Sequence, residues 1–127
     1  MVKKCFNDDL KTRTAAFAAR VRAFVKNIPM TFENQDDMKQ LVRSSGSVAA
    51  NYLEADEAES KKDFAHRCKI CRKESKESRL WLQLIRHGIP AHKFQECDAL
   101  IQESSEFILI FSAIIRKSGF DHGIARP

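Results

Sequence analysis

Four stretches of the chain carry apolar or small residues in alternating steps of three and four, and this repeat constrains the fold more than any other feature. In the first stretch the repeat runs through Leu10, Thr14, Phe17, Val21, Phe24 and Ile28. Such spacing places all of these residues on one side of an α-helix, where they can pack against neighbouring helices. Asn7 or Asp8 is expected to cap this helix, and Pro29 to end it.

The other three stretches follow the same rule. The second runs through Met38, Leu41, Val42, Ser45, Val48, Ala49 and Tyr52, with Thr31 or Asn34 as its cap. The third runs through Phe64, Cys68, Cys71, Ser75, Ser78, Leu82 and Ile85. The fourth runs through Phe94, Cys97, Ile101, Ser104, Ile108, Phe111 and Ile115. We call these four sets the apolar seams.

Local signals mark where the last two helices begin and end. Ser60, followed three residues later by Asp63, is typical of a capping box with a shorter acid. Gly88 is expected to stop the third helix. The fourth is expected over about residues 91–117, with Gly119 as its C-terminal stop and a loose tail over about residues 119–127.

Length and composition fit a bundle of these four helices. The chain has 127 residues with only four glycines and three prolines, which suits one helical domain over residues 1–127. Four helices of similar length with short connections predict an all-α fold, an antiparallel up-down-up-down four-helix bundle.

No apolar run approaches the roughly 20 residues of a membrane span, so we expect no membrane partner. The N-terminus MVKKCFNDDL does not have the pattern of a signal peptide. These features predict a cytoplasmic protein, in which Cys5, Cys68, Cys71 and Cys97 stay reduced.

The residues that could carry catalysis do not form a complete set. Cys68 and Cys71 have CxxC spacing, but a zinc site needs a second pair of ligands, and burial in the third seam explains both thiols. Asp63 and His66 form a single DxxH pair, whereas a di-iron bundle needs two Glu-x-x-His copies. We therefore expect no catalytic residues, no metal, no cofactor and no small-molecule substrate, and a protein that is not an enzyme.

Asn51 and Glu54 are polar residues on one flank of the second helix. They could form a functional polar site. Alternatively, they belong to a hydrogen-bonded layer that fixes helix register, bridging the second helix to the third or to a neighbouring subunit. We favour the structural role.

Positive charge is concentrated in two segments. Residues 1–28 hold seven basic and two acidic residues, and residues 60–88 hold nine and three, whereas residues 29–59 hold two and seven. The candidate nucleic-acid-binding residues are Lys11, Arg13, Arg20, Arg22, Lys26, Lys62, Lys69, Arg72, Lys73, Lys76 and Arg79. They predict sequence-nonspecific contact with the backbone of RNA or DNA. The alternative is a protein-interaction or scaffold module whose basic faces meet acidic protein surfaces, including the acidic second helix.

Several apolar residues lie outside the seams. Leu100, Phe107 and Ile114 form a second stripe on the fourth helix, and Ile70, Trp81 and Leu84 lie off the seam of the third. Since large apolar patches are unusual on monomers, these residues predict self-association.

The segments LVRSSGSVAANYLEADEAESKKDF and ESKESRLWLQLI carry a resemblance to a known family. They are similar to the bacterial four-helix-bundle proteins encoded in intervening sequences of 23S ribosomal RNA genes, and distantly to the accessory variability proteins of diversity-generating retroelements. Asn51 and Glu54 match the polar positions of the family motif Asn-Ile-Ala-Glu-Gly, and Ala55 stands where the family has glycine. The resemblance implies a non-enzymatic protein that forms homopentameric rings and binds nucleic acid.

Overall fold

The computed structural model describes residues 2–121, and side chains from Asp9 onward. The helices are α1 (Val2–Lys26), α2 (Gln35–Asp56), α3 (Lys61–Arg86) and α4 (Phe94–Ser118), with a short 3-10 turn, η1 (Ala91–Lys93), before α4. The expected all-α four-helix fold is confirmed.

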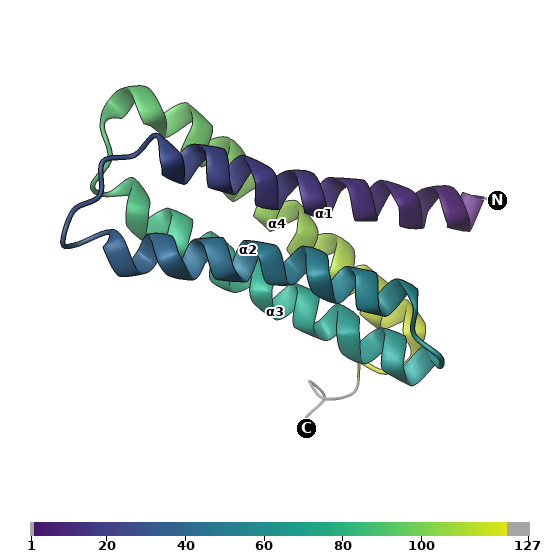
Figure 1. Ribbon diagram of the computed structural model, residues 1–127. Helices are drawn as coiled ribbons and strands as arrows, with labels where there is room; N and C mark the ends of the chain where they lie inside the picture. The colour runs from purple at the N-terminus through teal and green to yellow at the C-terminus, as the bar shows by residue number, and fades with distance from the viewer. Residues whose placement is uncertain (1, 122–127) are drawn as a thin grey trace.

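Successive helices run in opposite directions and lie side by side (Figure 1). The closest packing is between α2 and α3 and between α3 and α4, while α1 lies against α2 and touches α4 over a shorter length. Toward the ends of the chain, the N-terminal part of α1 runs apart from the C-terminal part of α4 (Figure 1). The helix α3 therefore lies between two close neighbours and exposes one outward face.

The predicted boundaries of α3 and α4 are close to those observed. The Ser60 hydroxyl accepts a hydrogen bond from the backbone N–H of Asp63 at 3.0 Å, so Ser60 caps α3 as expected. α3 ends two residues before Gly88. Gly119 ends α4 in the left-handed conformation, with φ of 84°, which glycine adopts without steric cost. Residues 122–127 of the expected tail lie outside the described residues.

The start of α1 was predicted wrongly. The helix begins at Val2, so Asn7 and Asp8 lie within it rather than at its cap. The first two turns of the helix give little periodic signal, because the apolar seam itself starts only at Leu10.

Asn34 occupies the N-cap position of α2, but its side chain does not cap the helix. Its amide oxygen accepts from the backbone N–H of Thr31 at 2.8 Å, and its amide N–H donates to the carbonyl of Pro29 at 3.2 Å. The two residues that we proposed as alternative caps of α2 are thus hydrogen-bonded to each other. They hold the loop that joins α1 to α2 instead of capping the helix through a side chain.

The four seams form the core. Every residue of the first seam is buried, and so are Tyr52, Cys68, Cys97 and Phe111 from the other three. At the edges, five seam residues are only half-buried: Val42, Ala49, Phe64, Phe94 and Ile101. The buried serines of the seams donate mainly to carbonyls of their own helices. Ser44, beside the second seam, forms a hydrogen bond of 2.8 Å with Ser78 that joins α2 to α3.

The second apolar stripe of α4 is not free for a partner molecule, contrary to our expectation. Leu100 and Phe107 are 1% and 0% exposed. The ring of Phe107 meets that of Phe17 on α1 edge-on, with centroids 5.4 Å apart. Because α4 has to cover both α3 and α1, it needs two apolar stripes inside a single chain.

Candidate nucleic-acid interface

The outward face of α3 carries a row of lysines. Lys62, Lys69, Lys73 and Lys76 recur at steps of seven, four and three residues, which places them on one side of the helix. Lys69 is half-buried and the other three are exposed. None of them has an acidic partner among the residues that the structure describes. We call these four residues the lysine ridge.

Arg72 and Arg79 flank the lysine ridge on the side of α4. Arg72 donates to the hydroxyl of Ser112 at 3.3 Å, and Arg79 donates to the hydroxyl of Ser105 at 3.2 Å. Serine is neutral, so both guanidinium charges remain uncompensated. The structure therefore brings together all six candidate residues of α3, four pointing outward and two held against α4.

The candidate residues of α1 are divided between two flanks of that helix. Lys11 forms an ion pair of 3.0 Å with Asp56 of α2. Arg13 faces the opposite way and pairs with Glu103 at 2.7 Å and Glu106 at 3.0 Å, both on α4. The hydrogen bond to Glu103 raises the pKa of Arg13 further above its ordinary value, so this charge is fixed and internally matched.

Arg22 lies across α2. It donates to the carbonyl of Ala18 on its own helix at 3.0 Å and to the carbonyl of Val42 at 3.3 Å. Gly46 provides the space, since a Cβ at that position would lie 3.0 Å from the Arg22 Nη2 atom. Arg20 and Lys26 are exposed and have no partner within the described part of the chain. Only these last two α1 candidates are free basic groups.

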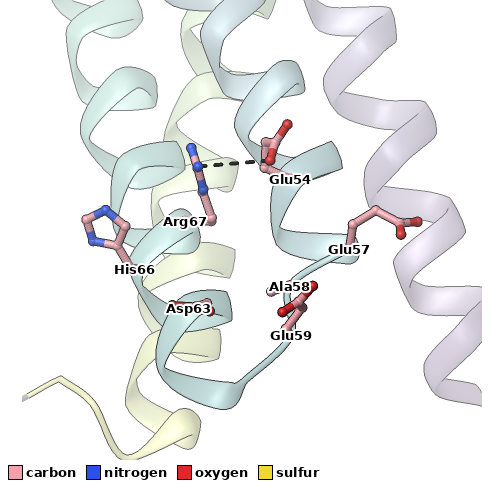
Figure 2. A pocket seen from close by; sticks show the side chains of 7 residues that line it. All are labelled: Glu54, Glu57, Ala58, Glu59, Asp63, His66 and Arg67. Atoms are coloured by element: carbon pink, nitrogen blue, oxygen red, sulfur yellow. Dashed lines mark ion pairs between the residues drawn. The ribbon is translucent and has the colours of Figure 1, made fainter.

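Asn51 and Glu54 join α2 to α3, as one of our hypotheses proposed. The amide oxygen of Asn51 accepts from Arg67 at 3.0 Å, and its amide N–H donates to the carbonyl of Ser47 at 2.9 Å. Glu54 and Arg67 point toward one another at 3.9 Å (Figure 2). Ala55 is buried within the helix with ordinary φ, so the backbone here does not require glycine.

The turn between α2 and α3 forms an acidic pocket. Figure 2 shows Glu54, Glu57, Glu59 and Asp63 around it, together with His66 and with Arg67, which reaches toward Glu54. Its negative charge would repel phosphate. Among the side chains that the structure describes, from Asp9 to Asp121, no group of three or more from histidine, cysteine, aspartate and glutamate is placed to hold a metal ion.

The cysteines of the described side chains are core residues. Cys68, Cys71 and Cys97 are fully buried and free. Burial raises the pKa of Cys68 to about 12 and that of Cys97 to about 11, and it raises the pKa of Cys71 as well. Thiols with such pKa values are poor nucleophiles and poor metal ligands. The side chain of Cys5 lies outside the described ones.

Sequence reasoning missed several residues beside the lysine ridge. Ser105 and Ser112 carried no signal of their own, although they are seven residues apart, as are Arg72 and Arg79. Matching seven-residue spacings on two antiparallel helices is the signal that could have found the serines.

Arg43 of α2 was also missed. It pairs with Glu77 at 2.8 Å and with the buried Glu74 at 3.3 Å, both on α3. It is one of only two basic residues between residues 29 and 59, so charge counts by segment give it no prominence.

The fold and the lysine ridge define an all-α four-helix protein with one strongly basic helix face. Within the described residues, no helix is long and apolar enough to cross a membrane. Comparison with known families gives a match to the 23S rRNA-intervening sequence protein family over residues 8–109. The chain therefore belongs to this family.

One similar solved structure is a crystal structure of a protein of unknown function from the S23 ribosomal protein family of Bacteroides thetaiotaomicron. It is 28% identical, with a TM-score of 0.70, over 87% of this chain and 97% of that one. No curated protein matches the chain.

Proposed function

We propose that this protein is a non-enzymatic nucleic-acid-binding protein that contacts the phosphate backbone of RNA or DNA through α3. The observation that carries the proposal is the lysine ridge: four lysines in a row on one helix face without a described acidic partner. The ridge differs in this respect from six other basic residues of the bundle, each of which is paired with a carboxylate: Lys11, Arg13, Arg43, Arg67, Arg86 and Lys93.

The dimensions of the ridge suit contact with several phosphates. Lys62 and Lys76 lie fourteen residues apart, or about 21 Å at a rise of about 1.5 Å per residue. One strand of duplex DNA presents a phosphate about every 3.4 Å along the helix axis. Flexible lysine side chains can follow such a backbone without reading bases, so we expect little sequence preference.

The α1 candidates contribute less in this proposal. Lys11 and Arg13 are held in ion pairs, and Arg22 is directed onto α2. Arg20 and Lys26 remain available for secondary contacts from a different face of the bundle.

The test compares two triple variants that remove the same charge. Changing Lys69, Lys73 and Lys76 to glutamine should weaken binding to mixed-sequence RNA and DNA alike. On duplex DNA it should also flatten the dependence of log affinity on log salt, by about 0.9 for each phosphate that the variant no longer neutralises. Affinity is measured by fluorescence anisotropy from about 50 to 200 mM salt.

The matched control changes three exposed basic residues outside α3 to glutamine: Arg20, Lys26 and Lys39. This control removes the same charge from the molecule as a whole, so it accounts for any loss of affinity that comes from net charge alone. It should have a smaller effect than the α3 variant on both affinity and salt dependence.

Three results would count against the proposal. If wild-type protein binds neither RNA nor DNA at low salt, nucleic-acid binding is wrong, and the acidic-protein partner takes its place. If the control variant loses as much affinity as the α3 variant, binding does not depend on α3. If only one sequence binds, backbone recognition is wrong.

We further propose that the protein works as a homo-oligomer in the cytoplasm, with five subunits as the family resemblance implies. Exposed leucines support association: Leu80 and Leu84 of α3 are 46% and 44% exposed, and Leu53 of α2 is 57% exposed. A ring would repeat the lysine ridge and raise affinity by avidity. The free thiols of Cys68 and Cys97 suit a reducing compartment.

A further inference from the structure

Three arginines of α3 form a regular ladder with α4. Arg72, Arg79 and Arg86 are seven residues apart, and each donates to an α4 side chain. Their partners are Ser112, Ser105 and Asp98, which are also seven residues apart, in the reverse order. The antiparallel packing of α3 against α4 thus repeats one contact at three levels, which we call the three rungs.

The rung at Arg86 is closed by a carboxylate. Arg86 donates to both oxygens of Asp98, at 2.6 and 3.0 Å. This two-pronged pairing raises the pKa of Arg86 and lowers that of Asp98, and the carboxylate neutralises the guanidinium charge that would attract an external anion.

The other two rungs are open. Arg72 and Arg79 each use one N–H on a serine hydroxyl, which leaves most of their five N–H donors available. Each serine oxygen accepts from its arginine, so its own O–H is available to donate. Neither hydroxyl makes another hydrogen bond within the described residues. A fixed guanidinium next to a hydroxyl donor is a suitable pair for a phosphate group.

The open rungs coincide with the lysine ridge. Lys76 lies four residues after Arg72 and three before Arg79, and Lys69 lies three before Arg72. These spacings place all four residues on adjoining sides of α3. Beyond Arg79 the outward face of α3 turns to exposed leucines, and the ladder closes with a carboxylate. After Arg79, therefore, the outward face of α3 changes from lysine to leucine, and the rungs change from open to closed.

We propose that the Arg72–Ser112 and Arg79–Ser105 rungs are two phosphodiester-binding sites. They would hold two phosphates of one nucleic-acid strand while the lysine ridge supplies the surrounding positive charge. The rungs are about 10.5 Å apart at a rise of about 1.5 Å per residue, close to three phosphate steps along a duplex strand. The proposal rests on the nucleic-acid-binding function proposed above, and it adds fixed, directional contacts to a set of flexible ones.

The closed rung at Arg86 suggests the variant that tests whether the open rungs bind phosphate. Ser105→Asp together with Ser112→Asp copies the closed rung into the two open ones, so each arginine acquires an internal carboxylate. We expect at least a tenfold loss of affinity for mixed-sequence RNA or DNA, with the four ridge lysines intact. Thermal unfolding should occur at the same temperature or higher, because the new ion pairs repeat the pairing of Arg86 with Asp98.

A charge-matched control distinguishes the effect of pairing Arg72 and Arg79 with carboxylates from the repulsion that any added negative charge exerts on nucleic acid. Ala50→Asp with Gln95→Asp adds the same two negative charges at exposed positions on α2 and at the start of α4. It should reduce affinity less than threefold. If the double aspartate variant is unstable, Arg72→Gln with Arg79→Gln provides a second route and should reduce affinity to a similar extent.

The outcomes distinguish this inference from the function on which it rests. If the Ser105→Asp/Ser112→Asp protein is folded and binds as tightly as the control, the rungs are not phosphate sites, while binding through the lysine ridge stands. If wild-type protein binds no nucleic acid at all, both are overturned. A larger loss of affinity for the double aspartate variant than for its control, seen for RNA and DNA sequences alike, supports the rungs as backbone sites.

Discussion

Burial in the centre of the bundle determines the chemical behaviour of three cysteines. Cys68, Cys71 and Cys97 were expected from their positions in the seams to be core residues, and the structure places each of them at 0% exposure. The Sγ atoms of Cys71 and Cys97 each approach a backbone carbonyl of a neighbouring helix at 3.5 Å. The CxxC spacing in this protein therefore lies on the inner face of a helix, where both cysteines pack in the core.

The buried thiols predict how stability depends on pH. Their ordinary pKa is 9.0, and burial raises that of Cys97 to about 11 and that of Cys68 to about 12. Between about pH 9 and 11 the unfolded chain loses thiol protons that the folded chain keeps. The free energy of unfolding should therefore be fully retained below pH 9 and fall as pH rises, by about 1.4 kcal/mol per pH unit for each thiol.

Urea unfolding at pH 8, 9 and 10 measures this dependence. The variant Cys68→Ala/Cys71→Ala should be about 1–3 kcal/mol less stable at pH 8 because of the cavity it leaves. It should also show a shallower fall above pH 9, since two of the thiols are gone. An equal pH dependence in the two proteins would contradict the assignment of these thiols as protonated core residues.

At the scale of whole helices, polar side chains on the flanks of each helix join it to its neighbours. α1 is joined to α2 by Lys11 with Asp56 and to α4 by Arg13 with Glu103. α2 is joined to α3 by polar side chains along its length: Arg43, Asn51 and the Ser44–Ser78 pair. The ion pairs among these contacts neutralise several of the charges that composition alone assigns to the surface.

Gly46 predicts that α2 can be made more stable. Glycine in the middle of a helix costs about 0.5–1 kcal/mol relative to alanine. A Cβ at Gly46 would meet the end of the flexible, exposed Arg22 side chain rather than a backbone atom. Since that guanidinium can move aside, Gly46→Ala should raise the free energy of unfolding by up to about 1 kcal/mol, measured by urea denaturation.

The double variant Arg22→Ala/Gly46→Ala tests whether Arg22 is the side chain that has to move aside. Without the arginine, the effect of Gly46→Ala should be at least as favourable as in the wild-type background. A destabilising Gly46→Ala change in both backgrounds would contradict this reason and would show that the glycine is needed for close packing of the helices.

The assembled molecule is expected to be larger than one chain. The stripe that contains Leu100 and Phe107 no longer argues for association, because α1 covers it. The exposed leucines of α2 and α3 and the family resemblance instead support association. Light scattering at micromolar concentration should give a mass about five times the 14.5 kDa of one chain.

Replacing Leu80 and Leu84 with serine should lower that mass without unfolding the protein, since both side chains are almost half exposed. Leu109, which is 72% exposed on α4, provides a matched comparison. A monomeric wild-type protein would contradict the association. An unchanged mass in the Leu80→Ser/Leu84→Ser protein would exclude the outer face of α3 as the interface.

The sequence by itself determined the four helices, the residues that face inward and the caps at Ser60 and Gly119, because these depend on local periodicity and backbone preference. The tertiary structure decided which flank residues meet. Pairing depends on the register between helices that are distant along the chain, so the sequence could not show that Lys11 and Arg13 are neutralised while the lysine ridge remains free. The same register placed serine opposite Arg72 and Arg79 but aspartate opposite Arg86. Helical repeats encode the direction of each side chain, while its partner is set only when the helices pack.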